Sequence, residues 1–196
     1  MPAPRTTWSA SLDGASWPPV RVTDPKANPR ALLLLANLGR PRRPSGVAVP
    51  YADPILPDAT VASAQLAEVV DQPVTAGDLA DLRRLQRASV DAAEAILAGA
   101  ALDSAEVNAL AAGSYARVEL VVTGGASRRQ MIWTDRSPAA ALARRLIEEL
   151  IALEPGRLRR CARPECGLLF YDTTRSRTRR WHAEDPCGWR KRQRVH

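Results

Sequence analysis

The sequence contains few of the residues that build disulfides or membrane spans. Three cysteines occur in 196 residues, and an odd number in a chain with no export signal argues against a disulfide framework. The longest apolar run, Ala31 to Ala36, is far shorter than the roughly 20 residues of a membrane-spanning helix. The first residues also lack the charged start and apolar centre of a secretory signal. We therefore expect a cytoplasmic protein without a membrane segment.

The features of common catalytic sites are missing as well. The chain has two histidines, both near its C-terminal end, and it contains no nucleophile elbow and no glycine-rich phosphate loop. We therefore expect that the protein is not an enzyme. Turnover that is lost on mutation of a carboxylate in the body of the chain would contradict this expectation.

Positive charge is concentrated at the C-terminal end. The segment from Arg157 to His196 holds twelve Lys and Arg against four Asp and Glu, whereas the whole chain carries a net charge of +7. The remaining residues are therefore close to neutral. A compact basic module on a neutral body is typical of a protein that binds a polyanion. The alternative is a solvated basic tail that only improves solubility.

The first part of the chain is rich in proline, and eleven of the sixteen prolines lie within residues 1–57. Such a composition predicts an extended, mobile leader over residues 1–30. The apolar stretch Ala31 to Leu38 indicates one structured piece, either a short helix or a buried strand. The predicted body of the protein then runs over residues 31–155.

Helical periodicity begins at Thr75, which can cap a helix with Asp78 close to its positive end. Leucines and alanines recur at helical spacing to about Leu97, and Gly99 ends the pattern. A second helix is predicted from Asp103 or Ser104 to Ala112.

A β-hairpin follows the predicted helices. Residues 117–123 alternate between polar and apolar side chains, Gly124 and Gly125 supply a turn, and residues 130–134 return. Ser137 and Pro138 then start a last helix that Pro155 and Gly156 end, which marks a hinge into the basic module. The predicted fold class is α+β, with a mostly helical N-terminal domain, a β-hairpin and a small zinc-stapled C-terminal finger.

All three cysteines lie in the basic segment, in the order Cys161-x4-Cys166, fifteen residues, His182-x4-Cys187. Zinc is bound by four tetrahedral N or S ligands, usually supplied as two close pairs. A module of forty residues buries too little apolar surface to be stable alone, so a metal has a structural purpose here. We predict one structural Zn²⁺ held by Cys161, Cys166, His182 and Cys187.

The fourth ligand is the least determined part of this prediction. His196 or a ligand from outside the chain could replace His182, and His182 could simply pack against Trp181. Three unrelated cysteines are the remaining alternative. With four protein ligands no position is left for water, which favours a structural over a catalytic metal.

The stretch from Arg160 to Lys191 resembles the CGNR zinc finger. That finger lies at the C-terminus of bacterial proteins with an ABATE-type N-terminal domain, which are regarded as stress-induced transcriptional regulators. The first cysteine pair, the turn from Phe170 to Arg175, and the sequence from Arg179 through Cys187 to Arg190 carry the resemblance. His182 stands where the family has cysteine, and Trp189 stands where it has asparagine. Looser similarity in the body, for example at residues 76–84 and 107–110, extends the resemblance to residues 31–155.

The resemblance implies a DNA-binding regulator whose finger spans residues 157–196 and whose body senses a ligand or dimerises. Double-stranded DNA is the expected partner, with a homodimer that reads two half-sites and a small-molecule effector of the N-terminal domain. Arginine suits phosphates and guanine edges. The residues predicted to contact nucleic acid are Arg175, Arg177, Arg179, Arg180, Arg190, Lys191, Arg192 and Arg194. An RNA-binding module and an adaptor for an acidic protein are the alternatives.

Overall fold

The computed structural model describes residues 29–40, 55–163 and 166–188. The predicted leader over residues 1–30 therefore lies almost wholly outside the described residues. The same holds for the basic residues from Arg190 to Arg194 and for His196.

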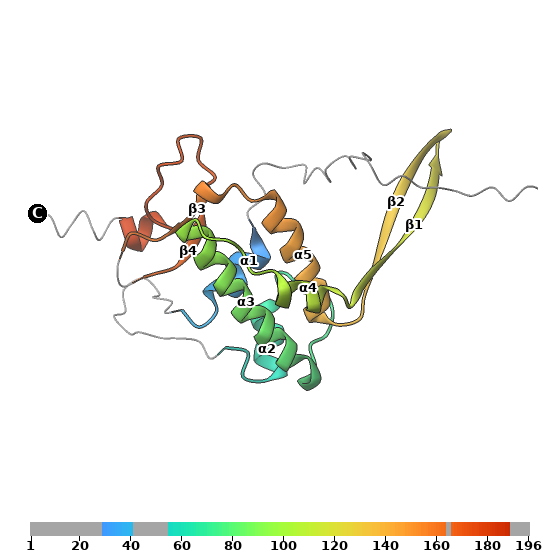
Figure 1. Cartoon of the computed structure of the whole chain (residues 1–196), viewed down its shortest axis with the longest axis horizontal. Coiled ribbons are helices and arrows are strands. Elements are labelled where there is room, and N and C mark those ends of the chain that lie inside the picture. Colours follow the sequence, from blue (N-terminus) through green and yellow to red (C-terminus); the bar gives the residue numbers. More distant parts are fainter. Residues whose placement is uncertain (1–28, 41–54, 164–165, 189–196) are drawn as a thin grey trace, which may run out of the picture.

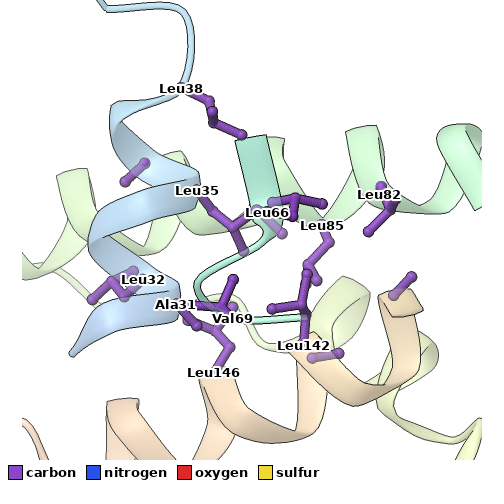
Figure 2. Packing of buried hydrophobic residues seen from close by; sticks show 14 of the residues in the cluster. Ala31, Leu32, Leu35, Leu38, Leu66, Val69, Leu82, Leu85, Leu142 and Leu146 are labelled. Atoms are coloured by element: carbon purple, nitrogen blue, oxygen red, sulfur yellow. The ribbon is translucent and has the colours of Figure 1, made fainter. Parts of the chain in front are cut away.

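Within the described residues, five α-helices form the body, and they pack around one hydrophobic core (Figure 1). They are α1 (Arg30–Asn37), α2 (Ala59–Leu66), α3 (Leu79–Ala98), α4 (Ala105–Ala111) and α5 (Pro138–Ala152). Figure 2 shows leucines of α1, α2, α3 and α5 meeting in this core. The apolar stretch after Arg30 is thus a helix and not a strand, and α2 is an element that the sequence did not predict. Among the described residues, no helix has the length and apolar character needed to cross a bilayer.

Local sequence explains where most helices begin and end. Thr75 and Asp78 form the capping box that precedes α3, with a short 3₁₀ turn over Ala76–Asp78. Gly99 ends α3 in the left-handed conformation at φ 65°, which favours glycine. The Ser137 side chain accepts a hydrogen bond from the backbone nitrogen of Ala140 at the start of α5.

The N-terminus of α1 is capped from a distant part of the chain. Pro29 precedes the helix and provides no side-chain cap. Instead, the Glu149 carboxylate of α5 accepts hydrogen bonds from the backbone nitrogens of Ala31 at 2.9 Å and Leu32 at 2.8 Å. These bonds satisfy two of the donors that every helix start leaves unpaired. Partial burial raises the pKa of the Glu149 carboxyl, although the hydrogen bonds oppose this shift.

The predicted hairpin is present and longer than expected. Strands β1 (Ser114–Thr123) and β2 (Ala126–Asp135) pair antiparallel along their full length, and Gly124 and Gly125 turn the chain with positive φ angles. The ribbon projects from the base of α4 and α5, away from the helical body (Figure 1).

The C-terminal module starts with a second, small sheet. A 3₁₀ turn over Pro155–Arg157 leads into β3 (Leu158–Arg160), which pairs antiparallel with β4 (Leu169–Tyr171). Leu158 and Leu169 belong to the same core as the helices. The sequence predicted a hinge at Pro155 and Gly156, but this shared core joins the two parts directly across that point.

Polar contacts reinforce this junction. The Asn37 amide donates to the carbonyl oxygen of Leu169 at 2.9 Å and accepts from its backbone nitrogen at 2.8 Å. The Glu94 carboxylate of α3 accepts from Arg40 at 3.1 Å and from Arg160 at 2.6 Å. The small sheet is therefore fixed to α1 and α3 by hydrogen bonds and ion pairs as well as by apolar packing.

Candidate metal centre

The first two cysteines are positioned by the turn that leaves β3. The backbone nitrogen of Cys161 donates to the carbonyl oxygen of Leu168 at 2.8 Å, and that of Cys166 donates to Arg163 at 3.0 Å. Gly167 has φ 63°, a left-handed conformation that lets the chain turn back into β4. These bonds place both sulfur atoms on the same side of the turn.

The second pair comes from the segment that follows β4. The backbone nitrogen of Ala162 donates to the carbonyl oxygen of Arg180 at 2.8 Å, which holds this segment against the first turn. His182 follows Arg180 two residues later, and Cys187 lies in a π-helical turn over Glu184–Gly188. The second pair therefore lies next to the turn that carries the first pair.

The four predicted ligands meet there. One ligand atom from each of Cys161, Cys166, His182 and Cys187 lies within 4.8 Å of the other three. The Nδ1 atom of His182 is 3.4 Å from the Cys166 sulfur and 3.7 Å from the Cys187 sulfur. Tetrahedral zinc with its usual bond lengths separates a nitrogen from a sulfur ligand by about 3.6 Å. These residues form a zinc-binding cluster that suits one structural Zn²⁺.

The protonation behaviour of the cluster agrees with a bound cation. Burial, together with charge repulsion from the neighbouring Cys161 and Cys187, raises the pKa of the Cys166 thiol to about 12. Burial likewise raises the pKa of Cys187. Three thiolates packed together need a positive ion to balance them. Burial, assisted by the positive charge of Arg179, lowers the pKa of His182 and favours the neutral imidazole that binds a metal.

Trp181 and Leu168 pack against the three cysteines and cover the cluster. The guanidinium of Arg180 lies over the Trp181 ring, 5.6 Å from its centre. Trp181 therefore supports the metal site by packing against it.

Arg179, one of the predicted nucleic-acid contacts, is used inside the finger. Its guanidinium donates to the carbonyl oxygen of Trp181 at 2.9 Å and also to that of His182. It further lies over the Phe170 ring, 5.4 Å from the ring centre. Arg179 thus holds the backbone next to the predicted zinc ligand His182 through hydrogen bonds, a role that the sequence did not predict.

The other predicted contacts fall into two groups. Arg175, Arg177 and Arg180 are exposed on the loop between β4 and the second ligand pair. Arg177 pairs with Glu154 at 2.7 Å. The remaining four, Arg190, Lys191, Arg192 and Arg194, lie outside the described residues, so the structure does not place them.

Asp172 is a central residue of the finger that the sequence analysis treated only as part of a turn. It is fully buried, and its carboxylate accepts hydrogen bonds from the backbone nitrogens of Thr174 at 2.9 Å and Arg179 at 2.8 Å. Burial alone would raise the pKa of Asp172, but the hydrogen bonds and the charge of Arg159 outweigh it and lower the pKa. An aspartate directly after an apolar strand and before a Thr-rich turn was the available signal.

Two comparisons bear on the identity of this module. A comparison with curated proteins found no match for the chain. The similarity of residues 31–155 to an ABATE-type domain therefore stays a prediction. The family model described as CGNR zinc finger matches residues 157–196, so the segment that supplies all four metal ligands is a zinc finger of this type.

Proposed function

We propose that the protein binds double-stranded DNA through its zinc finger and acts as a transcriptional regulator. The observation that carries this proposal is an arginine-rich loop, residues 173–180, which the finger holds in a fixed shape. The loop contains four arginines and no acidic residue. Electrostatic attraction to phosphates dominates nucleic-acid affinity, so such a loop is suited to the role.

Both ends of this loop are fixed by the buried Asp172. One carboxylate oxygen binds Thr174 near the start of the loop, through the backbone nitrogen and through the hydroxyl at 2.5 Å. The other oxygen binds the backbone nitrogen of Arg179 near its end. Because the loop is already ordered, less conformational entropy is lost when it binds a partner.

Two arginines of the β3 region bind carbonyl oxygens of the loop. Arg157 donates to the carbonyls of Asp172 at 2.9 Å and Thr174 at 3.0 Å, and Arg159 donates to that of Arg177 at 2.6 Å. These bonds occupy acceptor groups that would otherwise repel a phosphate. The loop therefore presents mainly donors and positive charge to its surroundings.

Arg175 and Arg180 are the strongest candidates for phosphate contacts. Arg175 is exposed and forms no ion pair within the described part of the chain, and Arg180 is exposed beside Trp181. Arg177 would have to exchange its pairing with Glu154 for a phosphate. Arg179 would support the contact surface from inside the finger.

A binding role is also more consistent with the metal centre than a catalytic role. Four protein ligands complete the tetrahedral shell of zinc, so no position is left for a reacting water. The zinc would then hold the two halves of the finger together, with the arginine loop between them. We accordingly propose that the protein is not an enzyme.

A sensing role of the helical domain is the second part of the proposal. A cavity of about 230 Å³ lies between α4, α5 and the segment before α4. Its lining is largely apolar and includes Leu102, Val107, Ile147 and Leu150. A small apolar effector would fit such a site better than a charged one.

The experiment is a salt series of binding to random duplex DNA, made with the zinc-loaded chain and with Arg175→Ala. We expect the logarithm of affinity to fall with the logarithm of salt at about −0.9 per phosphate contacted. Arg175→Ala should reduce this slope by about one phosphate contact. The matched control is Arg87→Ala, because Arg87 is exposed on α3 away from the finger.

The same series separates the alternatives. Tighter binding to single-stranded or structured RNA than to duplex DNA would favour the RNA-binding alternative. Equal loss from Arg175→Ala and Arg87→Ala would mean that charge alone, and not this loop, attracts the nucleic acid. Zinc-loaded protein that binds no nucleic acid but captures an acidic protein would contradict the proposal and favour the adaptor.

A further inference from the structure

The β1–β2 ribbon exposes more apolar surface than its own fold requires. Val118, Leu120 and Val122 of β1 are 64%, 74% and 65% exposed, and Met131 and Trp133 of β2 are 45% and 41% exposed. A two-stranded ribbon without further strands or a covering helix is marginally stable in water. Ten paired residues in each strand are long for a ribbon that no other element within the described residues covers.

These five residues lie on the same face of the ribbon. Side chains along a strand alternate between the two faces, so Val118, Leu120 and Val122 share one of them. Residues directly opposite in the register point to the same side, and Val118 pairs with Met131 while Ala116 pairs with Trp133. The result is a mainly apolar face, defined by Val118, Leu120, Val122, Met131 and Trp133, which also carries Arg129 opposite Leu120 and Ser127 opposite Val122.

The opposite face has a different character. It carries the polar residues Arg117, Glu119, Arg128 and Gln130 together with Tyr115, Val121 and Ile132, and Arg117 pairs with Glu119 at 2.7 Å. At the base of the apolar face, Arg144 of α5 lies over the Trp133 ring, 4.7 Å from its centre. The face of Val118 and Trp133 is therefore the more apolar of the two, and Trp133 contacts the helical body at its base.

We propose that this apolar face is a dimer interface, on which the ribbon of a second copy of the chain packs. If all five residues became fully buried, their exposed fractions would correspond to about 550 Å² of residue surface per copy, so two copies would bury at most about 1,100 Å², close to the roughly 1,000 Å² that a specific interface needs. A two-fold dimer uses the same patch on both copies, so one apolar face suffices.

The shape of the face fits an antiparallel arrangement of the two ribbons. Trp133, the largest side chain, lies near the base, whereas Val122 lies near the turn. Rotation about a two-fold axis through the middle of the ribbon brings the base of one copy against the tip of the other. Large and small side chains then meet, and Leu120 and Val118 lie close to the axis at the centre of the interface.

The position of the ribbon keeps the interface separate from the finger. Figure 1 shows the ribbon at one end of the molecule and the zinc finger at the other. Dimerisation would leave both fingers accessible, and it requires no nucleic acid. The proposed dimer can therefore be tested independently of the proposed DNA binding.

Sedimentation velocity on the full zinc-loaded chain, at micromolar concentrations and without DNA, tests the proposal. We expect a dimer for the unmodified chain. For Leu120→Glu and for Val122→Glu we expect the affinity of self-association to be at least about tenfold weaker. Both residues are exposed, so the zinc content and the fold of the monomer should stay unchanged. Ile151→Lys is the control, because Ile151 is 81% exposed on α5 outside the apolar face.

Three results would overturn the proposal. The first is an unmodified chain that is monomeric at these concentrations. Another segment of the chain or a different protein would then have to cover the apolar face. The second is a dimer that survives both glutamate variants. The third is a dimer that Ile151→Lys disrupts as strongly as Leu120→Glu, because the contact would then involve α5.

Discussion

Replacement of Asn37 by alanine should loosen the attachment of the zinc finger to the helical body. The Asn37 amide lies beside the outer edge of β4 and forms two hydrogen bonds with the backbone of Leu169, at 2.9 and 2.8 Å. Asn37→Ala removes both bonds and leaves the apolar contact of Leu169 in place.

The expected cost follows from these two bonds. A hydrogen bond contributes about 1 kcal/mol net, and leaving a partly buried backbone group without a partner adds to that cost. We therefore expect a loss of about 2–3 kcal/mol in the free energy of unfolding. For a protein of this size, such a loss lowers the melting temperature by roughly 4–12 °C.

The assay is thermal and urea unfolding of the zinc-loaded chain, with Asn108→Ala as the matched control. Asn108 is exposed on α4, and its amide reaches only the Ser104 hydroxyl at 3.2 Å. That substitution should change stability by less than about 0.5 kcal/mol. Equal effects of the two substitutions would refute the conclusion that Asn37 joins the finger to the body.

Two further substitutions test other long-range contacts. Asp172→Asn should destabilise the protein by about 2 kcal/mol at neutral pH, because the buried carboxylate accepts hydrogen bonds that an amide satisfies poorly. Since the folded pKa of Asp172 is lowered, its contribution is present above the unfolded value near 3.9 and is lost as pH falls through the folded value. Urea midpoints of the variant should therefore fall less steeply than those of the unmodified chain as pH drops below about 4, and parallel curves would contradict this. Glu149→Ala should cost about 1–2 kcal/mol, because it removes the cap of α1, and an unchanged urea midpoint would show that water replaces the carboxylate.

The sequence predicted those features that depend on neighbouring residues. The capping box at Thr75 and Asp78 and the serine cap at Ser137 act within one helical turn. The hairpin follows from two glycines between alternating strands. The metal ligands were predictable because zinc requires a particular set of residue types at close spacing.

Features that depend on distant contacts were not predicted. Helix α2 has a cap at Asp58 but only Ala62 and Leu66 buried, so its sequence shows little periodicity. Glu149 and the start of α1 are separated by 117 residues in sequence, and nothing local connects them. The role of Arg179 inside the finger could not be predicted either. The sequence does not show which arginines of a run face solvent and which donate to backbone carbonyl oxygens.

The metal content and coordination of the full chain test the central claim most directly. The cluster of three sulfurs and one imidazole nitrogen predicts one zinc per chain. Replacement of zinc by cobalt should give the absorption of a tetrahedral ion with three thiolate ligands, and His182→Ala should alter that spectrum. A folded chain that contains no zinc, and whose three cysteines all react freely with a thiol reagent, would contradict the account.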